Sequence, residues 1–197
     1  MRNKDVFIKQ LVAKIDFGKG VSNKIIEDIN KSVFCNYKSA GEIVLLEGKL
    51  CNDLFFLNKG LLRSYYSNSD GDDVTSSFVQ EGEFFTNVYG FNSGSPSNES
   101  IAVIEDAIYC SINKDDYMKL TLKYSELAML NYFIINNHRI ELEERIRMLQ
   151  NLGAKEKYRA FVLNYKKIID KVKLMHIASF LGIRLETLSR IKKNNIM

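Results

Sequence analysis

The chain has 197 residues, of which 46% are hydrophobic and 26% are charged, and its formal net charge at pH 7 is +4. This length and composition are typical of a globular protein with one large or two modest domains. No apolar run approaches the ~20 residues that a membrane span requires, and residues 1–15 alternate charged with apolar side chains, which excludes a signal peptide. The sequence therefore predicts a cytoplasmic protein without a membrane segment.

The charge is unevenly distributed along the chain. Residues 153–197 hold 11 Lys and Arg against 3 Asp and Glu, a balance of +8, whereas residues 1–152 hold 17 against 21, a balance of −4. A basic C-terminal fifth indicates that this part meets a polyanion, although a solvated basic helix would have the same composition.

Cysteine and histidine usage argues against metal or disulfide chemistry. Cys35, Cys51 and Cys110 are scattered, so a disulfide framework, a zinc site or an iron–sulfur cluster is not expected, and each is interpreted as a small buried hydrophobe. His138 and His176 fall in predicted helices without acidic or Cys partners at ligand spacing. We therefore expect no metal ligand among them, and no cofactor.

Taken in chain order, the first elements are two helices, over residues 3–15 and 22–33, with Ser22 as N-cap of the second. From residue 33 to 112 the period changes to two or to short apolar runs, which predicts strands. These strands cover 33–37, 42–47, 54–59, 61–67, 73–80, 99–104 and 106–112. Turn signals separate them, and Gly60, Gly71 and Gly82 recur every eleven residues, as expected for short strands wound into a roll or barrel.

The stretch 84–98 differs from the strands around it. It is rich in aromatic and small polar residues and contains the single proline, Pro96. An excursion of this kind between strands is often functional, and the alternative is a surface loop tied down by aromatic anchors.

A long helix is predicted from Asp115 over roughly 35 residues, ending at Gly153. Its apolar stripe consists of Leu120, Tyr124, Leu127, Leu130, Ile134, Leu142, Ile146 and Leu149. Coiled-coil pairing with a second copy would cover such a stripe. The polar residues Asn136, Asn137 and His138 interrupt a strict heptad, so a core helix within one chain is the alternative.

A helix over 154–167 then leads to two short amphipathic helices joined at Gly182. Ala178 allows a close crossing and Gly182 supplies the turn. Five apolar side chains wedge the two helices together: Ile177, Leu181, Ile183, Leu188 and Ile191. The pattern is that of a helix-turn-helix, and an ordinary helical hairpin capping a core is the alternative. The second helix presents a polar, basic face able to contact base edges and phosphates. The predicted DNA-binding residues are Arg184, Glu186, Thr187, Ser189, Arg190, Lys192 and Lys193.

Over nearly its whole length the chain resembles the Crp/Fnr superfamily of bacterial transcription regulators. Three motifs carry the resemblance: residues 37–48 as the first roll strands, Glu81-Gly-Glu-Phe-Phe85 opening the nucleotide cassette, and Leu185-Glu-Thr-Leu-Ser-Arg190 in the reading helix. It implies an α+β fold with a cyclic-nucleotide-binding-like, jelly-roll (double-stranded β-helix) effector domain over 1–120, a dimerisation helix over 121–152 and a helix-turn-helix domain over 153–197. It also implies a homodimer on a two-fold symmetric DNA operator, with base contacts from Glu186 and Arg190. RNA polymerase is a further candidate partner.

Two departures from the family pattern alter these expectations. Cyclic-nucleotide binders of the family carry a Glu for the ribose and an Arg–Ser/Thr pair for the phosphate. Here residues 86–89 lack that Glu and the pair reads Glu99-Ser100, so a carboxylate stands where a cation is needed. We therefore expect a degenerate or altered effector pocket that does not respond to cyclic AMP. Its candidate residues are Gly82, Glu83, Phe84, Phe85, Thr86, Tyr89, Glu99 and Ser100. The second departure is the ending, since the chain stops about six residues after the reading helix, without room for a β-hairpin wing.

These features favour a dimeric, sequence-specific DNA-binding regulator. The alternative is a small-molecule sensor or adaptor that no longer reads DNA. An enzyme on a cupin-like roll is not expected, because cupin metal chemistry needs clustered histidines and residues 33–112 contain none.

Overall fold

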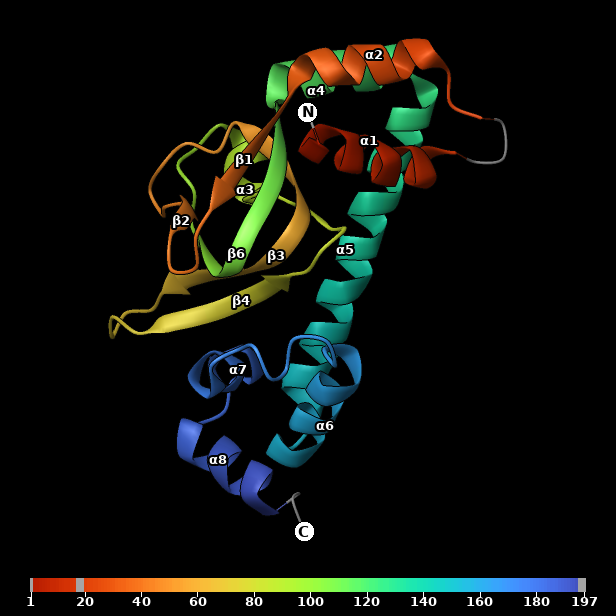
Figure 1. The fold of residues 1–197 in the computed structure, drawn as a ribbon. Coiled ribbons are helices and arrows are strands. Elements are labelled where there is room, and N and C mark those ends of the chain that lie inside the picture. Colours follow the sequence, from red (N-terminus) through yellow and green to blue (C-terminus); the bar gives the residue numbers. More distant parts are fainter. Residues whose placement is uncertain (1, 17–19, 195–197) are drawn as a thin grey trace.

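The computed structural model describes residues 2–16 and 20–194, which form a β-roll, a long helix and a C-terminal helical unit (Figure 1). The helices are α1 (Arg2–Ile15), α2 (Asn23–Ser32), α3 (Val88–Ser93), α4 (Lys114–Lys123), α5 (Ser125–Asn151), α6 (Ala154–Asn164), α7 (Leu174–Leu181) and α8 (Leu185–Asn194). The strands are β1 (Val33–Lys38), β2 (Ile43–Leu45), β3 (Asp53–Ser67), β4 (Asp73–Val79), β5 (Phe84–Phe85) and β6 (Ser100–Asn113). The expected α+β fold with a jelly-roll-like domain and several helices is confirmed.

All pairings among these strands are antiparallel. The sheet has the order β1-β6-β3-β4, while β2 also pairs with β6 and β5 with β3. The long strands β3 and β6 pair along most of their length and curl the sheet into the roll. Helices α1, α2 and α4 gather at one end of the roll, and α6, α7 and α8 lie at the other end of α5 (Figure 1).

The strand prediction is wrong at two places, because each of two expected strand pairs is one continuous strand. Residues 54–67 belong to β3, and residues 100–112 to β6. Gly60 does not end a strand but sits at an irregularity of the β3–β6 register, with φ of +109°. A Cβ atom there would lie 2.6 Å from the carbonyl oxygen of Asp106, so the glycine admits a close backbone approach and the strand continues.

The stretch 84–98 contains two short elements that the sequence did not predict, β5 and α3. The side chain of Asn87 caps α3 by accepting a hydrogen bond from the backbone N–H of Gly90 at 2.7 Å, and the helix ends at Gly94 in the left-handed conformation.

Both N-terminal helices form where expected, and the Ser22 hydroxyl accepts a hydrogen bond from the N–H of Ile25 at 3.4 Å as the N-cap of α2. The prediction of a single long helix is wrong, however. The chain is extended at Tyr124, with φ of −125° and ψ of 114°, which separates α4 from α5. Helix α6 ends at Asn164 instead of Lys167, and Gly153 is its N-cap.

The apolar side chains of α5 lie in two environments, and the predicted stripe did not include two of the exposed ones, Tyr132 and Ile135. Leu127 and Leu130 are buried against α1, α4 and the roll in the chain's own core. A second set is exposed at intervals of three, four or seven residues, with 37–63% of each side chain accessible: Tyr132, Ile135, Leu142, Ile146 and Leu149. We call this set the exposed stripe. In the sequence, Asn136, Asn137 and His138 fall between Ile135 and Leu142, and Asn137 lies on another face of the helix.

The cysteine prediction is wrong for two of the three residues. Antiparallel pairing of β1 with β6 sets Cys35 opposite Cys110, and the two sulfur atoms form a disulfide across 75 residues of sequence. The spacing of cysteines along the chain cannot reveal such a pair, because a sheet register created it. Cys51 is a free, buried thiol, as expected.

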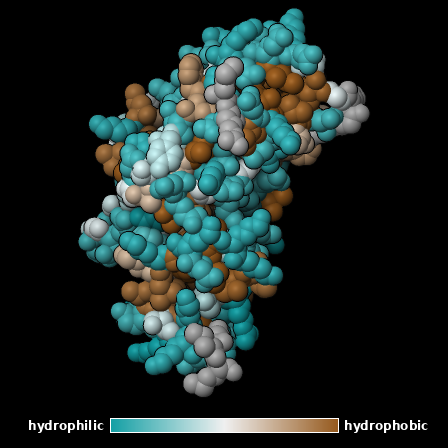
Figure 2. Space-filling model, viewed as in Figure 1, coloured by the Kyte–Doolittle hydropathy of each residue, from teal (hydrophilic) through white to brown (hydrophobic). Residues whose placement is uncertain are grey.

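The apolar core forms three clusters, of which the third joins the roll to the helix-turn-helix. It contains Leu61 and Phe78 from β3 and β4 together with residues of α6, α7 and α8, including Phe161, Phe180 and Leu188. The face of the molecule shown in Figure 2 is mostly hydrophilic. Apolar residues gather there in separate patches, one of them near the end of the molecule where α2 and α4 lie.

Candidate nucleic-acid interface and effector region

Helices α7 and α8 form the expected helix-turn-helix geometry. Gly182 adopts the left-handed conformation, with φ of 61° and ψ of 40°, and the N–H of Ile183 donates to the carbonyl of Ala178 at 3.1 Å. Ile177, Leu181 and Leu188 are almost completely buried between the helices. Glycine is the residue that takes this turn at least cost, and the apolar wedge fixes the crossing.

The outer face of α8 is open to solvent. All the predicted DNA-binding residues are exposed except Thr187, which is half-buried beside α6: the exposed ones are Arg184, Glu186, Ser189, Arg190, Lys192 and Lys193. Within residues 2–16 and 20–194, the four cations of this set form no ion pair. Their charge is therefore available to a polyanion, and Lys155 of α6 adds another cation beside Arg190.

The predicted effector residues do not converge on one cavity. Gly82 and Glu83 pair with the backbone of Leu57. Phe84 packs edge-on against Phe56 in the core below α1, while Phe85 stacks on Phe55 inside the roll, so neighbouring rings point to opposite faces of the strand.

The two polar candidates that follow have different surroundings. The Thr86 hydroxyl donates to the carbonyl of Asp53 at 2.9 Å and lies 3.2 Å from the sulfur of Cys51. Tyr89 lies on α3 with 55% of its surface exposed. Neither is in a position that marks it as a ligand group.

Glu99 and Ser100, which the resemblance predicts at the family's phosphate-holding position, already have protein partners. The Glu99 Oε2 atom accepts a hydrogen bond from the Ser76 hydroxyl at 3.0 Å, and the buried Ser100 hydroxyl accepts one from the N–H of Glu47 at 3.0 Å. Burial raises the pKa of the Glu99 carboxyl above its usual value, while the Ser76 hydrogen bond and the charge of Arg145 oppose this rise. This pair therefore contributes a carboxyl group and no cation to the region.

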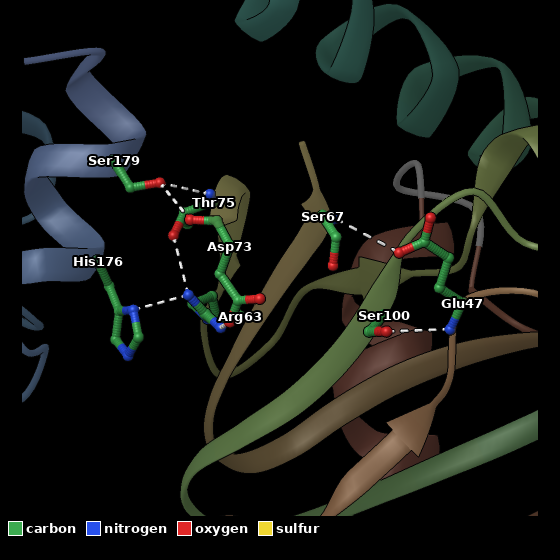
Figure 3. Close-up of polar contacts among 8 residues, drawn as sticks. All are labelled: Glu47, Arg63, Ser67, Asp73, Thr75, Ser100, His176 and Ser179. Carbon is green, nitrogen blue, oxygen red and sulfur yellow. Dashed lines mark hydrogen bonds and ion pairs between the residues drawn. The ribbon is translucent and has the colours of Figure 1, made fainter. Parts of the chain in front are cut away.

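A polar cluster that the sequence did not predict joins the roll to α7 (Figure 3). Arg63 of β3 is only 5% exposed, and its guanidinium contacts Asp73 at 2.8 Å, Thr75 at 3.3 Å and Nδ1 of His176 at 2.6 Å. The Ser179 hydroxyl accepts from the N–H of Thr75 at 2.8 Å and donates to the carbonyl of Asp73 at 3.1 Å. No local pattern marks these residues, because strand and helix are over 100 residues apart in sequence.

Arg145 of α5 is a second residue that the sequence did not single out. Its guanidinium donates to the carbonyl groups of Thr75 at 3.1 Å and Phe180 at 3.3 Å, and also to that of Ser76. It also stacks on the Phe180 ring, 4.1 Å from the ring centre. Arg145 thus connects the long helix, the roll and α7 at one point. Beside this junction a cleft of about 670 Å³ opens between Phe78, Arg145, Met148, Phe161 and Tyr165.

The roll matches a known domain family. Residues 36–124 match the family model described as the cyclic nucleotide-binding domain. Among curated proteins, the chain is 24% identical over 164 residues to electron transport regulator A of Shewanella oneidensis, a match that covers 77% of this chain and 64% of the length of that relative.

Several solved structures superpose on most of the chain. FixK2 from Bradyrhizobium japonicum superposes with a TM-score of 0.73 at 20% identity, covering 82% of this chain and 83% of that one. A Crp/Fnr-family transcriptional regulator from Eubacterium rectale gives 0.70 at 15% identity, with 88% and 83% covered. The c-di-GMP-responsive regulator CLP of Xanthomonas campestris gives 0.72 at 13% identity, with 89% and 92% covered.

The roll is thus a cyclic-nucleotide-binding-type domain in its fold. With the long helix and the helix-turn-helix, the chain has the fold of the Crp/Fnr transcription regulators, and the resemblance that its motifs indicated is confirmed. Over the described residues, no helix is both long and apolar enough to cross a membrane, and no group of three or more His, Cys, Asp or Glu side chains is arranged to hold a metal ion.

Proposed function

We propose that this protein is a homodimeric transcription regulator that binds a specific, two-fold symmetric DNA sequence through α8. The observation that carries the proposal is the exposed face of α8, where unpaired cations alternate with short polar side chains on a helix fixed by a buried apolar wedge. Such a helix fits the major groove, where Arg190 and Glu186 would contact base edges and Lys192 and Lys193 the phosphates.

The exposed stripe of α5 supports the dimer. Tyr132, Ile135, Leu142, Ile146 and Leu149 are spaced as the a and d positions of a heptad, with Arg139 at the a position between Ile135 and Leu142. Five large apolar side chains on one helix face are a contiguous surface that a monomer seldom exposes. Pairing with the same stripe of a second copy would cover it and would bring two helix-turn-helix units into one particle.

The polar contacts of the roll support an effector region that does not take cyclic nucleotides. Glu99 supplies a carboxyl group instead of a cation, and the Ser100 hydroxyl is held by the backbone of Glu47. We infer that this roll either takes a ligand without a phosphodiester or serves as a scaffold.

Selection of bound duplexes from a random DNA pool tests the proposal. We expect enrichment of an inverted repeat whose half-sites are about one helical turn, ~34–36 Å, apart. The matched control is the same selection with Arg190→Ala and Glu186→Ala combined, which should enrich nothing while the protein stays folded. Failure of the wild-type protein to enrich any sequence at low salt would contradict the proposal.

A further inference from the structure

Several polar contacts attach helix α7 to the roll. Ser179 continues the hydrogen bonding of β4 by accepting from the N–H of Thr75 and donating to the carbonyl of Asp73. One helix hydroxyl thus satisfies a donor and an acceptor on the backbone of the neighbouring domain (Figure 3). Two arginines then reinforce the same contact from different elements.

Arg63 is a buried charge whose partners come from both domains. Asp73 and Thr75 belong to the roll, Tyr65 supports the guanidinium at 4.1 Å from its ring centre, and His176 belongs to α7. Because a guanidinium only donates hydrogen bonds, Nδ1 of His176 accepts, and the neutral imidazole carries its proton on Nε2. Removing the acceptor from α7 would leave a donor of a buried cation unpaired, which is costly.

Arg145 holds the other end of α7. Its guanidinium donates to the carbonyl of Phe180, one of the last carbonyls of α7 that lack a partner within the helix. The same group donates to the carbonyls of Thr75 and Ser76 in β4. Below it, Phe78 of β4 packs against Phe180, Phe161 and Tyr165 at centroid distances of 5.3–6.1 Å.

We propose that Arg63, His176 and Arg145 are positioning residues, which fix α7, and with it the reading helix α8, at a set place on the roll. In a dimer joined through α5, this attachment sets the distance between the two reading helices. The inference rests on the proposed function and explains what would fix the spacing between the two half-sites of the operator. Because the outer face of α8 stays exposed in this attached arrangement, DNA can bind without the contact being broken.

The energetic consequence differs between one half-site and two. A single half-site needs only one helix-turn-helix unit, so its binding does not depend on the distance between two units. A full operator needs both units at the correct spacing, and the gain from the second contact depends on how well their geometry is fixed in advance. Loss of the attachment should therefore weaken binding to a full operator and leave binding to a half-site unchanged.

The test is His176→Lys, which sets an ammonium against the Arg63 guanidinium, compared with His176→Gln, whose amide oxygen can replace the acceptor. We expect His176→Lys to lose at least about tenfold in affinity for the selected full operator, with unchanged affinity for a single half-site. His176→Gln should stay close to wild type on both duplexes. Circular dichroism and light scattering verify that each variant is folded and keeps its oligomeric state.

A second pair of variants serves if His176→Lys does not fold. Arg145→Met removes the link between α5, β4 and α7, and Arg147→Met removes an exposed arginine two positions along the same helix. The first should reproduce the selective loss on the full operator and the second should not.

Three results would overturn the inference: equal loss on both duplexes, no loss on either, or tighter binding to the full operator by the Lys variant. A wild-type protein that binds neither duplex would instead refute the proposed function itself, and the inference with it.

Discussion

Nδ1 of His176 lies 2.6 Å from the Nη1 atom of Arg63, although 113 positions separate the two residues in the sequence. The pair works only with a neutral imidazole, since an imidazolium would bring a second cation against the guanidinium. Burial, followed by the charges of Arg63 and Lys173, lowers the pKa of His176 to about 4, while Asp73 opposes this shift. The attachment of α7 is thus coupled to the protonation of one histidine.

Acid should weaken the folded state through this residue. Because the pKa of His176 is about 4 in the folded protein and ~6.5 in the unfolded chain, the unfolded chain binds the proton first as pH falls. The contribution of His176 is therefore fully present above pH ~6.5 and is lost progressively down to about pH 4. Urea unfolding between pH 7.5 and 4.5 measures this loss as a falling free energy of unfolding.

His176→Gln is the control for this pH dependence, because glutamine keeps an acceptor for Arg63 and does not titrate. Its free energy of unfolding should change less between pH 7 and 5 than that of the wild type. Identical slopes for the two proteins in this window would assign the acid sensitivity to other groups.

The exposed stripe of α5 gives a prediction about assembly. Ile146→Glu places a charge within the stripe, so burial against a second copy would cost several kcal/mol. We expect light scattering to give the dimer mass for the wild type and the monomer mass for this variant at the same concentration. Asn137→Glu, an exposed change on α5 away from the stripe, should remain dimeric. A monomeric wild type at tens of micromolar would contradict the prediction.

Two substitutions on the outer face of α8 should distinguish contacts to bases from contacts to phosphates. Arg190→Ala should cost ~1–3 kcal/mol on the selected operator and less on random DNA, as expected for loss of a bidentate base contact. Lys193→Ala should weaken both duplexes alike and reduce the dependence of affinity on salt by about one released counterion. Titrations at several salt concentrations distinguish the two effects, and equal losses on both duplexes for Arg190→Ala would make it a phosphate contact.

The periodicity of apolar residues located most helices and strands but not the places where they end or continue. The helix-turn-helix could be predicted closely because Ala178, Gly182 and the apolar wedge are all local in sequence. The continuity of β3 through Gly60 could not be predicted. A glycine is needed there because the strand passes close to the carbonyl of Asp106 on another strand, and not because the chain turns. The interruption at Tyr124 was hidden for a related reason, since Leu120 and Leu127 keep helical spacing across it.

In the candidate site, too, residues placed by local helix geometry could be predicted, and residues placed by contacts between distant parts of the sequence could not. The exposed face of α8 follows from helical geometry alone, so its residues could be named from the sequence. Arg63, Arg145 and His176 owe their role to the docking of one domain on another, and nothing in their neighbourhoods along the chain marks them. The disulfide between Cys35 and Cys110 is likewise a product of sheet register.

The contacts around Glu99 lead to a prediction about ligands: cyclic AMP and cyclic GMP should not bind at physiological concentrations. The resemblance predicts Glu99 at the position of the family's phosphate-holding arginine. Its carboxyl group is half-buried and accepts a hydrogen bond from Ser76. An anionic phosphodiester brought to this place meets a like charge or must keep the carboxyl protonated. The pKa of Glu99 is raised by burial, which eases protonation but still supplies no cation for the phosphate.

The free energy lost with the phosphate-holding pair is large enough to prevent binding at physiological concentrations. Loss of a buried charge-assisted pair typically costs ~3–5 kcal/mol, and each ~1.4 kcal/mol is a factor of ten, so the dissociation constant of a micromolar ligand would rise to between about 0.1 mM and a few millimolar. Calorimetric titration with both nucleotides should give no measurable binding for the wild-type protein. Glu99→Gln removes the repulsion without adding a cation and should also fail to bind, whereas Glu99→Arg should improve affinity for the nucleotides. A dissociation constant in the low micromolar range for the wild type would show that another part of the roll holds the phosphate, and that Glu99 does not occupy the place of the family's arginine.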